Sequence, residues 1–247
     1  MTLPLLRPPR LREGDTIGLI NPSGALHEDE PYERAHAALQ ALGLRTREAP
    51  NLRARYGHMA GTPQQRADDL HAMFADDGIA GILAVTGGSG ANRVLPLLDA
   101  GLIARHPKLL GGFSDLTALI SAVHRATGLV TFHSPLARSD WNVFSAEHFR
   151  AVAMAAEAPL LRNPPERPPR PLRGGVARGP LQGGNLAVLT SLAGTPHFPD
   201  LTGAILTGAR LNGATYDERT LFPRGFKPDK AGMIPHIRNR KPRAPKA

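Results

Sequence analysis

The chain has 247 residues, of which 41% are hydrophobic and 21% charged, a balance typical of globular proteins. It contains no cysteine, which excludes disulfides and thiolate chemistry, and no apolar run of about 18 residues that could span a membrane. Because the N-terminus also lacks the apolar core of a secretory signal, we expect a cytoplasmic protein.

The net charge of +9 belongs mostly to the C-terminal end. Residues 205–247 hold ten Lys and Arg against three Asp and Glu, whereas the rest of the chain carries 20 against 18. A basic segment binds polyanions without specificity, and this one has few aromatic residues on which bases could stack. We therefore expect no specific nucleic-acid partner.

The first half of the chain alternates between patterns of buried strands and of amphipathic helices. Strands are expected at 15–20, 44–49, 79–85 and 108–110, with helices at 29–42, at 64–74, after the glycines at 87–90, and from 116 to a stop at Gly128. This order predicts an α/β fold whose parallel sheet is covered by helices. Functional sites in such sheets lie at the carboxyl ends of the strands.

Two glycine-containing turns fall at those ends. The first, Gly87 to Gly90, could bind phosphate through backbone N–H groups, although it fits neither common phosphate-loop pattern and has no lysine at the phosphate position. Backbone donors to a carboxylate or an oxyanion fit better, because Gly88 has no Cβ to hold a substrate away.

The second turn carries Ser114 between an expected strand and an expected helix. That placement is typical of a nucleophile elbow, in which backbone N–H groups face a developing oxyanion. The spacing is not the lipase-type G-x-S-x-G, however, and Ser114 and Asp115 could instead be helix caps. The stretch by itself leaves both interpretations open.

The character of the sequence changes after residue 140. A helix is expected at 145–157 with Ser145 as its cap, then a proline-rich linker, a helix introduced by Gly183, Gly184 and Asn185, and a strand at 203–207. No convincing helix or strand is expected after that. We predict an α/β nucleophile domain at 1–140, a helix and linker at 141–180, a partial, smaller C-terminal domain at 181–207, and a poorly ordered basic tail at 208–247.

Four stretches together resemble the serine LD-carboxypeptidase family, which includes muramoyl-tetrapeptide carboxypeptidases and microcin C self-immunity peptidases. They are LREGDTIGLINPSG at 11–24, TGGSGANRVLPLLD at 86–99, PKLLGGFSDLTAL with GLVTFHSP at 107–135, and LQGGNLAVLTSLAGTPHFPDLTGAIL at 181–206. The stretches follow the order of the family, which makes the match far more specific than any one of them.

The resemblance implies a hydrolase of the Ser-His-Glu type that removes the terminal D-residue from an L,D-linked cell-wall tetrapeptide in peptidoglycan recycling. By position, Ser114 would be the nucleophile, and the N–H groups of Gly88 and Asp115 would form the oxyanion hole. The resemblance implies a homodimer and neither a metal nor another cofactor.

The chain departs from the family at two places. Thr86 and Ser89 replace an arginine and an aromatic residue around the two glycines, which alters the site for the substrate carboxylate. The run that carries the family's glutamate reads Gly208-Ala209-Arg210, and no Gly-His-Gly-like turn follows it.

Several residues could stand in for the missing base and its orienting acid. Glu218 and His236 lie in no matching motif, His124 is expected on a solvent-facing helix position, and His133 is interpreted as structural. The mismatch between the C-terminal segment and the family suggests a shifted reading frame or a degenerate terminus, and hence a weak or inactive enzyme. The alternatives are a non-catalytic muropeptide-binding protein and a protein that binds polyanions through the basic tail.

Overall fold

The computed structural model describes residues 3–160, 181–199, 215–216 and 234–235. The described residues fall into two compact units, one formed by 3–160 with 181–199 and one that contains the short segments at 215–216 and 234–235. The expected strand at 203–207, most of the proline-rich linker and most of the basic tail lie outside the described residues. The domain limits given above therefore stay a prediction.

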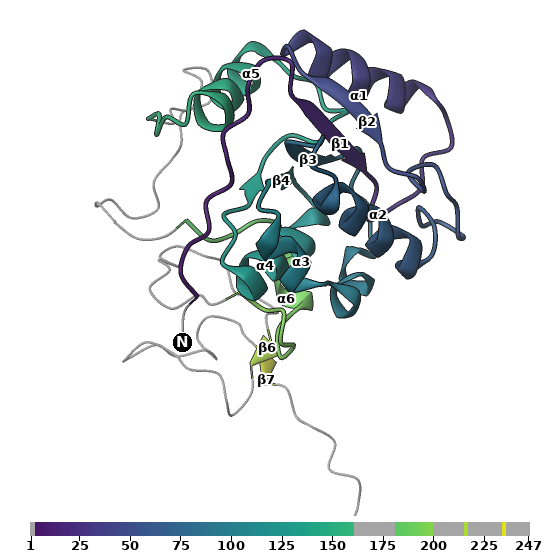
Figure 1. Ribbon diagram of the computed structural model, residues 1–247. Helices are drawn as coiled ribbons and strands as arrows, with labels where there is room; N and C mark the ends of the chain where they lie inside the picture. Colours follow the sequence, from purple (N-terminus) through teal and green to yellow (C-terminus); the bar gives the residue numbers. More distant parts are fainter. Residues whose placement is uncertain (1–2, 161–180, 200–214, 217–233, 236–247) are drawn as a thin grey trace, which may run out of the picture. The chain divides into compact units, whose positions relative to one another are not determined.

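A five-stranded parallel sheet with strand order β2-β1-β3-β4-β5 forms the centre of the first unit (Figure 1). Its strands are β1 (Thr16–Ile20), β2 (Arg45–Glu48), β3 (Gly81–Ala84), β4 (Leu109–Gly112) and β5 (Phe132–His133). The α/β fold with a parallel sheet is thus confirmed, and each expected strand of the first half of the chain is present.

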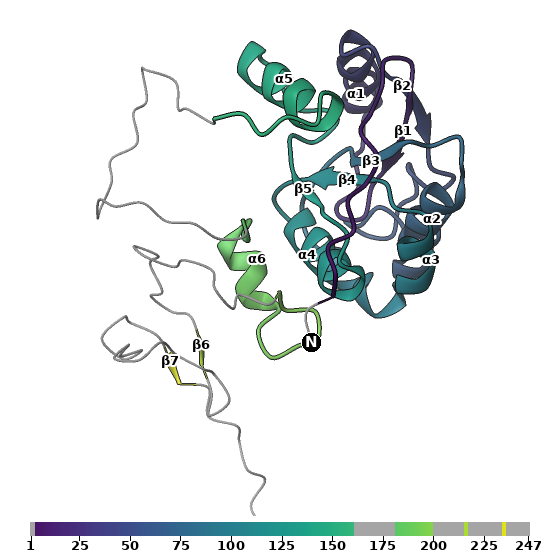
Figure 2. The same ribbon diagram turned by 60° about the vertical axis from the view of Figure 1, so that its left-hand side comes forward.

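Helices cover both faces of this sheet. They are α1 (Glu30–Ala41), α2 (Pro63–Ala75), α3 (Ala100–Arg105), α4 (Leu116–Thr127) and α5 (Val143–Phe149), while α6 (Leu186–Ser191) contacts α4. Helices α1 and α5 lie on one face and α2, α3 and α4 on the other (Figure 2). Right-handed crossovers with this strand order require this placement for α1, α2, α3 and α4. No helix in the described part of the chain has the length and apolarity needed to cross a membrane.

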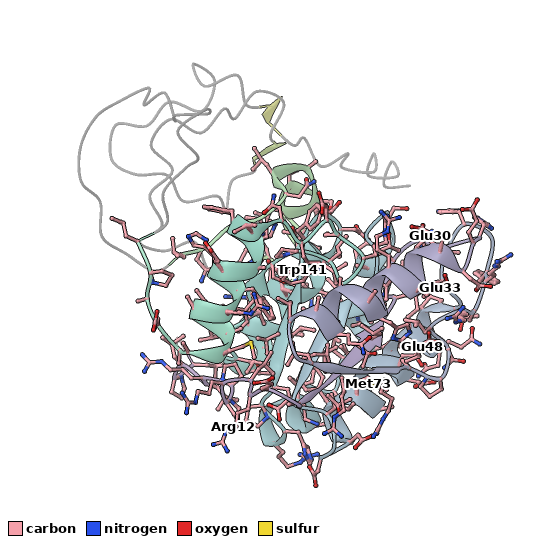
Figure 3. The ribbon with its side chains drawn as sticks, turned by 90° about the horizontal axis from the view of Figure 1, so that it is seen from above. Arg12, Glu30, Glu33, Glu48, Met73 and Trp141 are labelled. Carbon is pink, nitrogen blue, oxygen red and sulfur yellow. The ribbon has the colours of Figure 1, made fainter. Side chains whose placement is uncertain are left out.

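The three inner strands are buried almost completely, which explains why their sequences are continuous apolar and glycine runs. Helix α2 comes close to β1 because Gly18 carries no side chain. A Cβ at Gly18 would lie 2.6 Å from Sδ of Met73, a core residue on α2 (Figure 3). This close packing holds α2 against the face of the sheet.

The strand order reverses between β1 and β3, since the chain moves from β1 outward to β2 and then returns to the other side of β1. Ligands in open α/β sheets bind in the crevice that such a reversal leaves at the carboxyl ends of the strands. The loop after β1 and the glycine turn after β3 flank this crevice, and the loop after β4 is adjacent to it.

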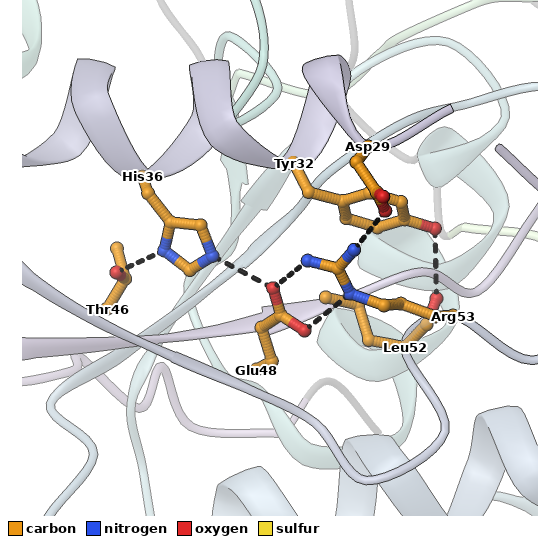
Figure 4. Close-up of polar contacts among 7 residues, drawn as sticks. All are labelled: Asp29, Tyr32, His36, Thr46, Glu48, Leu52 and Arg53. Atoms are coloured by element: carbon orange, nitrogen blue, oxygen red, sulfur yellow. Dashed lines mark hydrogen bonds and ion pairs between the residues drawn. The ribbon is translucent and has the colours of Figure 1, made fainter. Parts of the chain in front are cut away.

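A polar network fastens α1 to the edge strand β2 (Figure 4). The imidazole of His36 lies between Thr46 Oγ1, at 2.6 Å from Nδ1, and Glu48 Oε1, at 2.9 Å from Nε2. Arg53 donates two hydrogen bonds to the Glu48 carboxylate and stacks 4.2 Å above the ring of Tyr32. These contacts, first of all those from Arg53, lower the pKa of Glu48 to about 2.

Two helix predictions need correction. The helix expected after the glycine turn is broken into two 3₁₀ turns, Ala91–Arg93 and Leu95–Leu97, because Pro96 has no N–H to continue an α-helical ladder. The helix expected at 145–157 begins two residues earlier, since Asn142 and not Ser145 is its cap, and it continues as a π-helical turn at Arg150–Met154.

The C-terminal part also differs from expectation. Two short parallel strands, β6 (Thr215–Tyr216) and β7 (Ile234–Pro235), pair in a stretch where no strand was predicted. Two residues per strand are too few to leave an alternating pattern in the sequence. Helix α6, in contrast, follows Asn185 as predicted.

Candidate active site

Ser114 lies on a sharp turn between β4 and α4, and its backbone is strained. Its φ angle is +64°, in the left-handed region that costs a residue with a Cβ about 1–2 kcal/mol. Such strain persists where the surrounding structure enforces it, which is common at active sites and is the backbone feature of a nucleophile elbow. The turn therefore presents the serine at the carboxyl end of the sheet.

Asp115 does not serve as a helix cap. It is the N-cap residue of α4, yet its side chain accepts no hydrogen bond from that helix. Its buried carboxylate instead accepts hydrogen bonds at Oδ2 from Ser23 Oγ at 2.7 Å and from the N–H of Ala91 at 2.8 Å. The capping interpretation is thus wrong for Asp115, which connects the loops that follow β1, β3 and β4.

Gly88 lies in the glycine turn that faces this serine. The Gly24 N–H donates to the carbonyl of Gly87 at 3.1 Å. Since a planar trans peptide points its C=O and N–H in opposite directions, the Gly88 N–H points away from Gly24. A Cβ on Gly87 would lie 3.3 Å from Ser114 Oγ, so the hydroxyl is beside this same peptide group.

Only glycine fits at position 88. Its φ is +122°, and a Cβ there would lie 3.1 Å from the nitrogen of Gly24. Within the described residues, the N–H groups of Gly88 and Asp115 donate no backbone hydrogen bond. Two backbone donors that flank a strained serine can stabilise negative charge on an atom bound between them.

The phosphate alternative is weakened by the helix that follows the glycine turn. This helix is a three-residue 3₁₀ turn, too short to supply the aligned N–H groups and dipole of an α-helix. The turn is thus better suited to single N–H contacts than to a phosphate group.

The serine opens into a cavity of about 520 Å³. Helix α6 forms one wall and is held by the Asn185 N–H, which donates to Thr117 Oγ1 of α4 at 2.9 Å. The residues around the cavity come from three loops, from the 3₁₀ turn and from α6, namely His58, Met59, Gly88, Ser89, Gly90, Asn92, Arg93, Ser114, Asp115, Asn185, Ala187, Val188 and Ser191. The one acid among these described lining residues, Asp115, already accepts hydrogen bonds from Ser23 and Ala91. The guanidinium of Arg93 therefore makes the cavity suitable for an anionic ligand.

The histidines predicted near the elbow lie apart from this cavity. His133 pairs with Gly112 at the end of β5, and its ring centroid is 6.3 Å from that of Phe113. Its side chain is exposed, and partial loss of hydration lowers its pKa. His124 is half-buried and not solvent-facing as expected, because its Nδ1 is 2.8 Å from the carbonyl oxygen of Leu129. Neither histidine lines the cavity.

Glu218 and His236 lie outside the described residues. His58 does line the cavity, but sequence reasoning did not single it out, because it sits in a polar loop without a recognisable motif.

Sequence reasoning also did not single out three other residues that support the site. Ser23 and Gly24 follow β1 in a Pro-Ser-Gly turn, and their position beside the reversal of strand order is the signal that could have identified them. Arg138 donates from Nε to Thr86 Oγ1 at 3.1 Å, which places a guanidinium next to one of the two positions that depart from the family pattern.

A strained serine beside two backbone donors, at the carboxyl end of a parallel sheet, is the arrangement of serine hydrolases. Comparison with family models matches residues 17–134 to the LD-carboxypeptidase N-terminal domain and residues 178–216 to the LD-carboxypeptidase C-terminal domain. The chain belongs to the LD-carboxypeptidase family.

Individual relatives agree with this assignment. A Bacillus subtilis protein named "Probable murein peptide carboxypeptidase" is 36% identical over 203 residues, which cover 81% of this chain and 63% of the relative. The murein tetrapeptide carboxypeptidase of Pseudomonas aeruginosa is 36% identical over 187 residues, which cover 72% of this chain and 60% of the relative. The chain thus spans less than two thirds of the length of either relative.

Solved structures share the fold. The crystal structure of an MccF-like protein from Bacillus anthracis superposes with a TM-score of 0.71 at 26% identity, covering 79% of this chain and 67% of that one.

Proposed function

We propose that this protein is a serine peptidase that removes the terminal D-amino acid from an L,D-linked muropeptide. The observation that supports this most strongly is the strained backbone of Ser114, whose hydroxyl lies beside the Gly87–Gly88 peptide in a cavity with an anion-compatible wall. The similarity to murein peptide carboxypeptidases supplies the substrate class.

In the proposed reaction, Ser114 Oγ bonds to the carbonyl carbon while its proton passes to a base. The N–H groups of Gly88 and Asp115 stabilise the oxyanion that forms on the carbonyl oxygen. The C–N bond then breaks, the leaving D-amino acid takes up a proton at its nitrogen, and water hydrolyses the acyl ester to regenerate the serine.

The free carboxylate of such a substrate needs a cationic partner. Arg93 is the one arginine among the described residues that line the cavity. A guanidinium suits this task because its N–H groups match the geometry of a carboxylate.

The direct test measures release of D-alanine from an L,D-linked tetrapeptide by the full chain, by Ser114→Ala and by Ser145→Ala. Ser145 lies on α5, on the opposite face of the sheet from α4, and serves as the matched control. We expect release by the native chain and the control, and none above background from Ser114→Ala. Equal release from Ser114→Ala would refute the assignment of the nucleophile.

One observation favours the second candidate, a muropeptide-binding protein without catalysis. No hydrogen bond joins Ser114 to an imidazole within the described part of the chain, so the serine has no visible base there. Saturable binding of the tetrapeptide by the native chain, without D-alanine release and without labelling of Ser114 by a serine-reactive phosphonate, would support binding alone.

A further inference from the structure

Arg66 is a charged residue placed in the interior beneath the candidate site. It lies in the first turns of α2, after a capping box formed by Thr62 and Gln65, and only 2% of its surface is exposed. Charged side chains are rarely buried to this extent unless they are paired, because the loss of hydration is costly. Its retention in the core therefore calls for a physical role.

The hydrogen bonds of Arg66 go to backbone carbonyls and not to an acid. Nη1 donates to the carbonyl oxygen of Pro22 at 2.6 Å and to that of Gly90 at 3.0 Å, and Nε donates to that of Thr62 at 3.4 Å. None of the ion pairs in the described segments includes Arg66. One guanidinium thus connects the loop after β1, the glycine turn after β3 and the start of α2.

These contacts fix the direction of two peptide groups. Because the Gly90 carbonyl points at Arg66, the N–H of Ala91 in the same peptide points the opposite way, and it donates to Asp115. On the other loop, Pro22 accepts from Arg66 while the next residue, Ser23, donates its hydroxyl to the same carboxylate oxygen.

The two loops are therefore held between a cation on one side and an anion on the other. The cation is Arg66, and the anion is the residue that follows Ser114. A third link, from the Gly24 N–H to the Gly87 carbonyl, joins the same two loops and sets the direction of the Gly88 N–H. Loss of the guanidinium leaves the carbonyls of Pro22 and Gly90 without their buried donor, so both loops are expected to shift.

We infer that Arg66 is a positioning residue of the candidate site: its buried guanidinium clamps the Pro22 and Gly90 carbonyls and so keeps the Gly88 N–H directed at the position of the oxyanion. This inference rests on the proposed function. It assigns Arg66 no contact with the substrate, and its effect reaches the reaction through the geometry of the two loops.

The test compares Arg66→Met and Arg66→Lys with Lys108→Met. Lys108 is a matched control, because it is also a buried cation that donates to backbone carbonyls of α2, those of Met73 and Asp76 at the other end of the helix. Either methionine variant removes one buried cation, but only the change at Arg66 reaches the loops of the site. Two readouts are followed on the full chain: the rate of Ser114 labelling by a fluorophosphonate, normalised to the folded fraction, and amide hydrogen exchange.

Displacement of one oxyanion donor should slow labelling of Arg66→Met by about 100-fold. We expect Arg66→Lys to be slowed less, since one ammonium can reach fewer carbonyls, and Lys108→Met to be labelled at the native rate. Exchange should accelerate in Arg66→Met at the N–H groups of Gly24 and Ala91, which are hydrogen-bonded in the two loops, and stay unchanged there in Lys108→Met. If Arg66→Met does not fold, Arg66→Lys provides the same comparison.

The outcomes separate the two proposals. Native-rate labelling of Arg66→Met, or equal slowing by Lys108→Met, would overturn the inference about Arg66 and leave the proposed function standing. If the native chain itself is not labelled, the proposed catalytic function fails, and the exchange measurement alone decides whether Arg66 holds the two loops.

Discussion

The strain at Ser114 predicts that this residue lowers the stability of the fold. Replacement by glycine removes the Cβ that makes φ of +64° unfavourable, whereas replacement by alanine keeps it. Relief of left-handed strain is worth about 1–2 kcal/mol, and the greater backbone freedom of glycine in the unfolded chain offsets about 0.5–1 kcal/mol of it. Ser114→Gly should therefore be more stable than Ser114→Ala by about 0.5–1 kcal/mol.

Both variants lack the hydroxyl, so both should resist phosphonate labelling and differ only in stability.

Urea and thermal unfolding of the two variants measure the difference. For a chain of this size, about 1 kcal/mol corresponds to a shift of about 2–4 °C in Tm. The comparison is internally controlled, since neither variant retains the Oγ atom. A Ser114→Gly variant that is equal to or less stable than Ser114→Ala would refute the argument that the turn is strained.

Three further predictions concern neighbouring groups. The pKa of Glu48 is about 2 in the folded chain against 4.5 in the unfolded chain, so the pairing with Arg53 stabilises the fold fully above pH 4.5 and loses its effect as the pH falls toward 2. Allowing for partial solvent screening, that effect is about 1–2 kcal/mol. In urea unfolding, the free energy of unfolding should therefore change less between pH 6 and pH 3 for Glu48→Gln than for the native chain. Gly88→Ala should slow Ser114 labelling by about 100-fold or more, because the added Cβ collides with the opposing loop and turns the N–H away; labelling at the native rate would exclude this N–H from the oxyanion hole. Asp115→Ala should reduce the free energy of unfolding by about 2–4 kcal/mol, since two buried donors lose their acceptor, and a loss below about 0.5 kcal/mol, within the range of an ordinary surface change, would contradict the role given to that carboxylate.

The sequence was sufficient to predict the sheet and the turn that carries Ser114, because both are local patterns. Buried strands are continuous apolar runs, and a strand, a turn and a helix succeed one another between 108 and 128. Where a local signal was overlooked, the prediction was wrong, as at Pro96, whose missing N–H breaks the expected helix into 3₁₀ turns.

The supporting contacts of the site could not be predicted in this way. Arg66 reaches Pro22 across 44 positions, and Asp115 reaches Ser23 across 92. An arginine at a polar helix start has the same sequence signature whether it faces water or the core. Only the packing of α2 against the face of the sheet decides that this one is buried.

The two borders of the sheet have a consequence for how the protein behaves in concentrated solution. Strand β2, at one border, reads Arg-Thr-Arg-Glu and alternates between exposed and half-buried positions, while β5, at the other border, has only two residues. A border strand with unpaired backbone groups can recruit another chain and seed aggregation, and charge or shortness prevents this. Both borders of this sheet are protected, one by its charges and the other by its brevity, so the five strands are not expected to extend into a continuous sheet between molecules.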